Sequence, residues 1–152
     1  MIWDVVTGRE LHRFPRELPG TNCVLFSPDG KWLAAGRGNH FGSSPGEIKI
    51  WDTENWTEIY SLEHNNSVWG VAFSPDGRRL ASASGRFSQG NGNGEEYGQV
   101  KVWDLTKGQE LLTLHDHSCI YGVAFSPNGK VLVSGSAVGT IRFWGDLSGL
   151  SP

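Results

Sequence analysis

The residues best suited to metal chemistry lie in one short run, His115-Asp116-His117. On a strand, side chains two residues apart point the same way, so the two imidazoles could face one ion. Zinc needs three or four ligands in a fixed geometry. Neither His64 nor His40 is placed by the sequence as a third ligand, so we expect no metal and no other cofactor.

The chain also lacks the sequence signatures of calcium loops and of common catalytic sites. Asn91, Asn93, Glu95 and Glu96 offer oxygen ligands, but the alternating acidic positions and final glutamate of a calcium loop are missing. Neither a G-x-S-x-G nucleophile elbow nor a phosphate-binding P-loop is present. The most prominent serines belong to a repeated turn, which indicates architecture rather than a nucleophile. We expect that the protein is not an enzyme.

Two long polar segments are the strongest candidates for recognition. They read RGNHFGSSPGE at 37–47 and RFSQGNGNGEEYGQ at 86–99. Loops held on a rigid scaffold often carry binding function, and each segment pairs an aromatic side chain with a basic one. The segments are either Gly/Asn-rich spacers or a recognition flap, whose candidate contacts are Arg37, His40, Phe41, Arg86, Phe87 and Tyr97.

Both segments interrupt a repeat that runs through the chain. Near-identical stretches occur at 23–30, 70–77 and 122–129, each with Phe-Ser-Pro-Asp/Asn-Gly at its end. A Trp-Asp pair follows at 51–52 and 103–104, a modified Trp-Gly-Asp at 144–146, and an earlier Trp-Asp at 3–4. The tryptophans are spaced by 48, 52 and 41 residues, which is the sequence signature of a repeat architecture.

Each repeat predicts four short strands, here called a to d in chain order. Strand a is expected at 21–26, 68–73 and 120–125, and the Ser-Pro-Asp-Gly turn after it returns the chain because Pro fixes φ and Gly adopts a left-handed conformation. Strand b is expected at 32–35, 79–82 and 131–134, strand c at 48–51, 100–103 and 141–144, and strand d at 9–14, 57–62 and 110–114. Strands a and b carry apolar residues at both odd and even positions, and therefore on both sides of the sheet. This predicts that both of their faces are covered.

Composition supports short strands and argues against several classes of partner. The chain has 21 glycines, 7 prolines and 7 tryptophans among 152 residues, and a formal net charge of −3. This charge gives no basis for binding nucleic acid or an anionic membrane. The chain has no apolar run of membrane-spanning length and no signal-peptide pattern at its start, so we expect a soluble cytoplasmic protein. Cys23 and Cys119 lie in non-adjacent repeats and are not expected to form a disulfide.

These features together resemble the WD-repeat β-propeller family over essentially the whole chain. The residues that carry the resemblance are the repeated turn, Leu-Ala-Ser-Ala-Ser at 80–84, Val-Ser-Gly-Ser at 133–136, Gly-Thr-Ile-Arg-Phe-Trp at 139–144 and the Trp-Asp endings. The resemblance implies an all-β propeller with about three four-stranded blades. It also implies that Trp51, Trp103, Trp144, His64 and His117 are structural residues.

The family's polar network is expected to be incomplete here. The family is described with a Gly-His pair before strand a and an Asp in the b–c turn, joined to the Trp and a strand-b Ser by hydrogen bonds. In this chain His64 follows Glu63, His117 follows Asp116, and Val138 stands where the turn Asp is expected. We therefore predict that no blade has the whole network and that apolar packing contributes most to stability.

The array does not supply enough blades for a closed propeller. We expect residues 1–14 to end a preceding blade, 20–62 to form blade one, 64–114 blade two, and 117–146 a blade three without its outer strand. Closure needs about four to eight blades. Either the sequence is part of a longer chain, which we favour, or two copies form a six-bladed ring as a homodimer. A lone copy would expose strand edges and an apolar blade face.

The resemblance implies a non-catalytic scaffold that binds a protein or peptide on the face with the b–c insertions. Further candidate contacts flank the first apolar residue of strand a, namely Ser67, Trp69 and Tyr121. Trp and Tyr are enriched at interface hot spots, although Trp69 and Tyr121 could instead pack between blades. The alternative function is the regulatory or sensing propeller of a larger enzyme, such as a kinase or protease.

Overall fold

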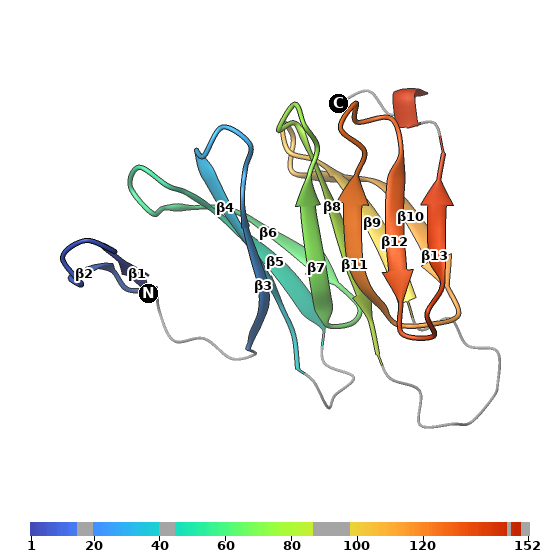
Figure 1. The fold of residues 1–152 in the computed structure, drawn as a ribbon, viewed down its shortest axis with the longest axis horizontal. Coiled ribbons are helices and arrows are strands. Elements are labelled where there is room, and N and C mark those ends of the chain that lie inside the picture. Colours follow the sequence, from blue (N-terminus) through green and yellow to red (C-terminus); the bar gives the residue numbers. More distant parts are fainter. Residues whose placement is uncertain (15–19, 40–44, 87–97, 146, 150–152) are drawn as a thin grey trace.

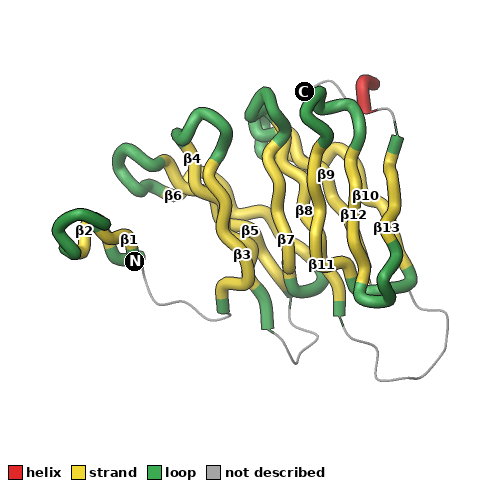
Figure 2. The backbone as a smooth tube through the Cα atoms, viewed as in Figure 1, coloured by secondary structure: helices red, strands yellow, loops and turns green. Residues whose placement is uncertain are grey.

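The structure is a computed structural model that describes residues 1–14, 20–39, 45–86, 98–145 and 147–149. In these ranges the chain forms an all-β array of sheets that stand side by side in a row (Figure 1). The backbone trace shows strands joined by short turns, with one short 3-10 turn near the C-terminus, η1 at Leu147–Gly149 (Figure 2). No helix in the described ranges has the length and apolarity needed to cross a membrane.

Two complete sheets and one three-stranded sheet make up the three blades. Blade one contains β3 (Thr21–Phe26), β4 (Trp32–Arg37), β5 (Gly46–Asp52) and β6 (Glu58–His64). Blade two contains β7 (Val68–Phe73), β8 (Arg79–Gly85), β9 (Gly98–Asp104) and β10 (Gln109–Asp116). Blade three contains β11 (Ile120–Phe125), β12 (Leu132–Ser136) and β13 (Ile141–Trp144). Neighbouring strands within a blade are antiparallel, and their order in the sheet follows their order in the chain.

A small hairpin precedes blade one. It pairs β1 (Ile2–Trp3) with β2 (Glu10–His12) in a separate two-stranded sheet. Trp3 pairs with Glu10 as Trp51 pairs with Glu58 and Trp103 with Glu110. The hairpin therefore corresponds to the end of strand c and to strand d of a blade before blade one.

The predicted strands match the observed ones most closely where a turn signal bounds them. The three predicted a strands, which end at the Ser-Pro turn, have the observed bounds. Strands b, c and d of blades one and two run up to three residues beyond the prediction at the end near the insertions, because ladder pairs continue there through Arg37–Glu47 and Gly85–Gly98. Small or polar residues at those positions gave no strand signal.

The Ser-Pro-Asp/Asn-Gly turn has the same geometry in all three blades. In blade one the Ser27 hydroxyl donates to Asp29 Oδ1 at 2.6 Å and accepts from the Trp32 amide at 2.9 Å. Gly30, Gly77 and Gly129 all have positive φ, between 69° and 73°, as the turn prediction requires.

Apolar cores lie between the blades rather than within any one of them. One cluster joins blade one, through residues such as Ile48 and Ile50, to Leu80 and Trp103 of blade two. A second cluster joins Val100 and Val102 of blade two to blade three. Each blade therefore uses a neighbour to bury its faces.

Burial consequently falls off at both ends of the row. Every residue of β8 in blade two is buried, as predicted for covered strands. The prediction of two covered faces is wrong for β3, where Phe26 is 54% exposed, because among the described residues only the two-stranded hairpin precedes blade one. On blade three Ile141 is 71% exposed and Phe143 75% exposed. The expected exposure of a blade face is thus observed.

Candidate functional site

One edge of the array contains the boundaries of both insertions. We call it the insertion edge: the described residues 20–22, 37–39, 67–69, 85–86 and 119–121. Strands β4 and β8 end there, and β3, β7 and β11 begin there, at the lower edge of Figure 1. Segments from all three blades therefore meet along one side, as expected for the face with the b–c connections.

A β-bulge occurs at the same place in each a strand. The register skips one residue between Thr21 and Cys23, between Val68 and Gly70, and between Ile120 and Gly122. The extra residue of each bulge is Asn22, Trp69 or Tyr121. Bulges re-aim a side chain and are over-represented beside functional sites. Three bulges in register therefore present three side chains along the insertion edge.

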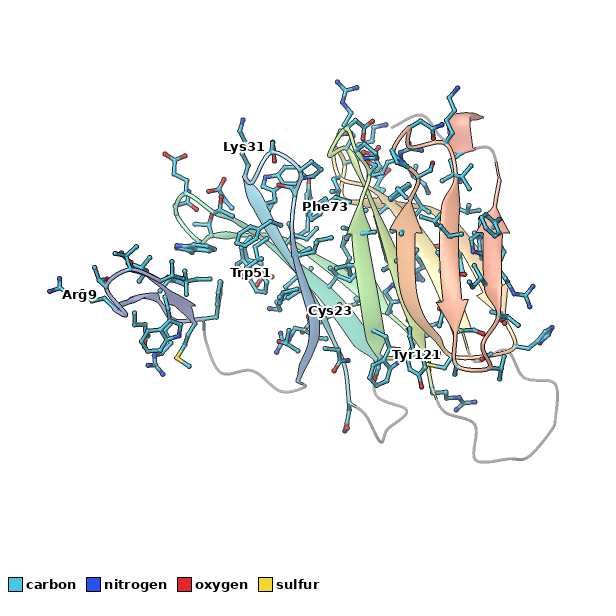
Figure 3. All side chains as sticks on the ribbon, viewed as in Figure 1. Arg9, Cys23, Lys31, Trp51, Phe73 and Tyr121 are labelled. Carbon is cyan, nitrogen blue, oxygen red and sulfur yellow. The ribbon has the colours of Figure 1, made fainter. Side chains whose placement is uncertain are left out.

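The aromatic pair Trp69 and Tyr121 bridges blades two and three. Their rings meet edge to face with centroids 6.0 Å apart, and Trp69 Nε1 donates to the Gly85 carbonyl oxygen at 2.9 Å. Tyr121, labelled in Figure 3, remains 41% exposed. A Cβ on Gly70 would lie 2.7 Å from the Tyr121 carbonyl oxygen, so the two a strands come very close. The pair is both an inter-blade contact and part of the surface.

Asn22 makes the corresponding contact between blades one and two. Its Nδ2 donates to the Val68 carbonyl oxygen at 2.9 Å, while its Oδ1 is buried and has no hydrogen-bond partner among the described residues. The row of bulged residues thus combines one amide with two aromatic rings.

Arg37 does not behave as the predicted surface contact. It is buried, at 5% exposed, and its Nη1 pairs with Glu47 Oε1 at 2.7 Å. Glu47 also accepts from the Ser61 hydroxyl. Because Arg37 and Glu47 are ladder partners at the two ends of the first insertion, their ion pair closes that end of the blade. We therefore correct the prediction and assign Arg37 a structural role.

Ser67 is also buried, at 2% exposed, and is corrected in the same way. Its hydroxyl donates to the Asn39 carbonyl oxygen at 2.7 Å, and its own carbonyl accepts from the Gly85 amide at 3.1 Å. It thus ties the starts of the two insertions together. Arg86 is exposed at the insertion edge. The remaining candidates, His40, Phe41, Phe87 and Tyr97, lie outside the described residues.

Blade two contains three members of the polar network. Ser82 Oγ lies 2.6 Å from His64 Nε2 and accepts from Trp103 Nε1 at 2.9 Å. His64 comes from the end of β6, so the network links blade one to blade two. Nδ1 of His64 is buried without a hydrogen-bond partner among the described residues. Blade two thus retains three members of the network among the described residues, while the absence of a complete network stays a prediction, because most of the connection between β8 and β9 lies outside them.

Burial keeps His64 neutral. Loss of solvent, helped by the charge of Lys101, lowers the pKa of His64 from 6.5 to about 3. A neutral imidazole can share the Ser82 hydroxyl without bringing a charge into the core. The network is therefore a structural element in which a neutral imidazole and a tryptophan share one serine hydroxyl inside the core.

Blade three replaces the histidine with an ion pair. The residue that pairs with Gly98, as His64 pairs with Gly46, is Asp116 and not His117. Asp116 is buried and lies 2.5 Å from Arg142 Nε, whereas His117 is exposed. The assignment of His117 as a structural residue is therefore corrected, because it lies one residue past the equivalent position. Trp144 still donates to a strand-b serine, Ser134, at 2.9 Å.

The described residues of blade one contain no such network, and an aromatic ring packs on the tryptophan instead. Ala35 occupies the strand-b position of Ser82, since both pair with the lysine two residues before the Trp. The ring of Phe14, from the N-terminal segment, lies 4.8 Å from that of Trp51. Trp51 is half-buried as a result.

Sequence reasoning missed Arg79, which clamps blade two to blade three. Its guanidinium donates to the carbonyl oxygens of Gly129 and Leu147 at 3.1 and 3.2 Å and lies over the Phe125 ring. The corresponding residues in the other blades are Trp32 and Val131, so no repeat pattern pointed to it.

The described residues offer no group of three or more His, Cys, Asp or Glu side chains that could hold a metal. His115 and His117 are both exposed on either side of the buried Asp116. Cys23 and Cys119 are free thiols, and burial raises the pKa of the Cys119 thiol to about 11. The thiols are thus poor nucleophiles.

Two family models match the chain. Residues 108–145 match "WD domain, G-beta repeat", and residues 2–89, more than half of the chain, match "Eukaryotic translation initiation factor eIF2A". The β-propeller domain of Cps50 (Swd1) from Myceliophteria thermophila superposes with a TM-score of 0.69. That match covers 87% of this chain and 37% of the other, at 23% sequence identity, and so shows the propeller fold.

Curated relatives cover nearly all of the chain. WD repeat-containing protein srw1 of Schizosaccharomyces pombe is 24% identical over 95% of this chain and 24% of its own length. Apoptotic protease-activating factor 1 of Rattus norvegicus is 29% identical over 99% of this chain and 11% of its own length. The chain thus spans a quarter or less of these relatives. It belongs to the WD-repeat family of β-propellers, and its residues 2–89 also fall within the family described as eukaryotic translation initiation factor eIF2A.

Proposed function

We propose that the chain is a non-catalytic interaction scaffold that binds a peptide or protein segment on its insertion edge. The observation that carries the proposal is the row of three β-bulges, which presents Asn22, Trp69 and Tyr121 side by side beside the insertions. The net charge of −3 favours a protein partner over nucleic acid.

The bulged aromatic residues have the properties of interface anchors. Trp69 is half-buried and held by its bond to Gly85, so little side-chain entropy would be lost when a partner covers it. Tyr121 is 41% exposed and held against Trp69. Rigid aromatic rings with polar ends contribute a large part of the energy at interfaces. Exposed Arg86 adds a cation at the same edge.

A peptide library displayed on phage would test the proposal. Peptides selected on the intact chain should lose about 2 kcal/mol or more of binding free energy when Trp69→Ala or Tyr121→Ala is introduced. Phe26→Ala is the matched control, because Phe26 is 54% exposed at the opposite end of β3. Circular dichroism would check that each variant is folded. Binding that is unchanged in both edge variants would refute this site.

A second candidate is the sensing or regulatory propeller of a larger multidomain protein, such as a kinase or protease. Its support is the coverage of the relatives: the chain matches only 11% of apoptotic protease-activating factor 1. The two candidates differ in what the insertion edge would bind, either a separate partner or another domain of the same polypeptide. Sequencing the gene on both sides of the region encoding this chain would separate them.

We further propose a reducing compartment such as the cytoplasm. The support is that both cysteines are free thiols, with Cys119 buried.

A further inference from the structure

The a–b and c–d turns form the edge of the array that lies opposite the insertion edge. We call it the turn edge: residues 27–31, 52–57, 74–78, 104–108 and 126–130. It is the upper edge in Figure 1, and the labelled Lys31 marks its first turn in Figure 3. The residue after the turn glycine is basic and exposed in every blade, namely Lys31, Arg78 or Lys130. The turn edge therefore presents a cation from each blade.

The charge around these cations changes along the row. In blade one Lys31 lies among the turn residues Asp29, Asp52 and Glu54, so acids outnumber the base. At the joint of blades two and three, equivalent positions have more positive residues: Asn128 for Asp29, Thr106 for Glu54, Lys107 for Asn55 and Arg79 for Trp32. The turn edge is thus acidic at blade one and basic at the second joint.

Backbone bonds bring the cations of the second joint together. The Leu105 amide donates to the Arg78 carbonyl oxygen at 2.9 Å, which ties the c–d turn of blade two to its a–b turn. Arg79 Nη2 donates to the Gly129 carbonyl oxygen at 3.1 Å, which holds the a–b turn of blade three against blade two. We call the four cations gathered in this way the basic turn patch: Arg78, Arg79, Lys107 and Lys130.

Arg79 is a buried cation with no acid beside it. The residue is 8% exposed, its terminal nitrogens donate only to the carbonyl oxygens of Gly129 and Leu147, and its Nε is buried without a hydrogen-bond partner. Among the described residues no carboxylate forms an ion pair with Arg79. A buried charge without a counter-ion is costly. An anion that settles on the surface above Arg79 is therefore favoured, since burial weakens the screening of its charge.

The acids near the patch neutralise it only in part. One oxygen of Asp76 is occupied by hydrogen bonds within its own turn. Asp104 is buried and lies 3.4 Å from Lys107 Nζ, although the Lys107 side chain remains 59% exposed. Two described acids thus stand against four bases, while Asp146 lies outside the described residues. The patch keeps a net positive charge on a chain whose formal net charge is −3.

We propose that the basic turn patch is a second docking surface, which binds an acidic peptide segment, rich in Asp and Glu, of a partner protein. Carboxylates of the segment pair with the exposed Arg78, Lys107 and Lys130, and their field offsets the charge of Arg79. The half-buried Phe125 ring already lies under Arg79, and the described patch offers no other ring on which a nucleic-acid base could stack. A peptide therefore fits the patch better than a nucleic acid does.

Binding of fluorescein-labelled decaglutamate, followed by fluorescence anisotropy, tests the proposal. Arg78→Glu and Lys130→Glu should each raise the dissociation constant ~tenfold, because each places a negative charge against the ligand. Lys31→Glu is the matched control, since Lys31 also follows a turn glycine but lies among three acids. It should change the dissociation constant less than about twofold. Affinity in the parent chain should fall steeply between about 50 and 500 mM sodium chloride.

Neutral variants and a second ligand keep the test decisive. Arg78→Gln and Lys130→Gln should weaken binding by about threefold each, and they replace any charge-reversed variant whose circular dichroism shows loss of fold. Trp69→Ala, on the insertion edge, should bind decaglutamate like the parent chain, so the two proposed surfaces are tested separately. No binding at about 50 mM salt, or an equal loss in Lys31→Glu, would overturn the proposal. Tighter binding of a single-stranded RNA of equal charge would overturn it as well, and would assign the patch to nucleic acid.

Discussion

Blades two and three are built from the same repeat, yet among the described residues only blade two has a complete or nearly complete blade on each side. Val102 and Phe143 occupy one register position, and the first is fully buried while the second is 75% exposed. The strand-b serines differ in the same direction. Ser82 bonds both a tryptophan and His64, whereas among the described residues the side chain of Ser134 bonds a tryptophan and no histidine. The pattern of the repeat thus determines where a strand forms, while the neighbouring blade determines how far its side chains are buried and which hydrogen bonds they make.

The polar residues at the joints between blades also depend on the neighbouring blade. His64 reaches Ser82 from the end of blade one, so its environment is made by two blades. Asp116 occupies the corresponding place before blade three and pairs with Arg142, whose side chain is 46% exposed. A buried neutral network and a half-solvated ion pair therefore perform the same joining role.

The largest expected difference concerns two isoleucines at one register position. Ile48→Ala should lower the free energy of unfolding by about 2–5 kcal/mol, because Ile48 is fully buried between blades and truncation leaves a cavity. Ile141→Ala should cost less than about 0.5 kcal/mol in the dilute chain, since Ile141 is 71% exposed. Urea denaturation of both variants measures the contrast. Similar losses would mean that Ile141 is covered in solution.

Acid should weaken the joint between blades one and two through His64. The folded pKa of about 3 is below the unfolded value near 6.5, so the unfolded state binds the proton first as the pH falls. The contribution is fully present above pH 6.5 and declines by up to about 1.4 kcal/mol per pH unit below it.

The interval from about pH 6.5 to 4.5 isolates this effect, because carboxylates titrate mainly below it. Across it, stability should fall by about 2–3 kcal/mol in the parent chain and much less in His64→Gln. The exposed His117 provides the control, and His117→Gln should retain the slope. Equal slopes in the parent and His64→Gln would show that His64 is protonated in the folded state.

The two strand-b serines allow blades two and three to be compared by the number of hydrogen bonds that each serine makes. Ser82→Ala should cost about 2–3 kcal/mol, because it leaves both Trp103 Nε1 and His64 Nε2 without a partner in the core. Ser134→Ala removes a single bond, to Trp144, and should cost about 1 kcal/mol. Thermal unfolding of the two variants gives the ranking, and a larger loss for Ser134 would contradict the comparison.

The last comparison concerns two equivalent glycines of strand a. Gly70→Ala should cost about 1–3 kcal/mol, because its Cβ would meet the Tyr121 carbonyl oxygen of blade three. Gly122→Ala should be neutral or slightly stabilising, because no atom lies within 4 Å of a Cβ there. Unfolding curves for the two variants would test whether the approach of β7 to β11 is as close as described.

The strands and turns could be predicted from the sequence because their determinants are local. A Pro-Asp-Gly turn and an alternating run before a tryptophan are short signals, and the bounds of β3, β7 and β11 follow from them. The polar partners could not be predicted in this way, because they depend on register between strands. His117 looked equivalent to His64 by residue type, whereas the ladder assigns that place to Asp116.

The candidate site was predicted only in part for a related reason. Trp69 and Tyr121 were singled out by position and residue type, and they do lie together on the insertion edge. Arg37 and Ser67 looked like surface residues because they are polar and border loops. Their burial depends on Glu47 and Asn39, partners that no local pattern reveals.

The a–b turn has a consequence for how amide protons exchange with solvent. Each turn closes within six residues through the Ser amide and the carbonyl at the start of strand b, as in Ser27 to Trp32 and Ser74 to Arg79. Every a–b hairpin is therefore closed by local bonds, while slow exchange also requires neighbours that keep the hairpin from opening. Deuterium uptake should be slowest in β8 and β9 and fastest in β13 and β1, so that a gradient of protection runs outward from the middle of the row.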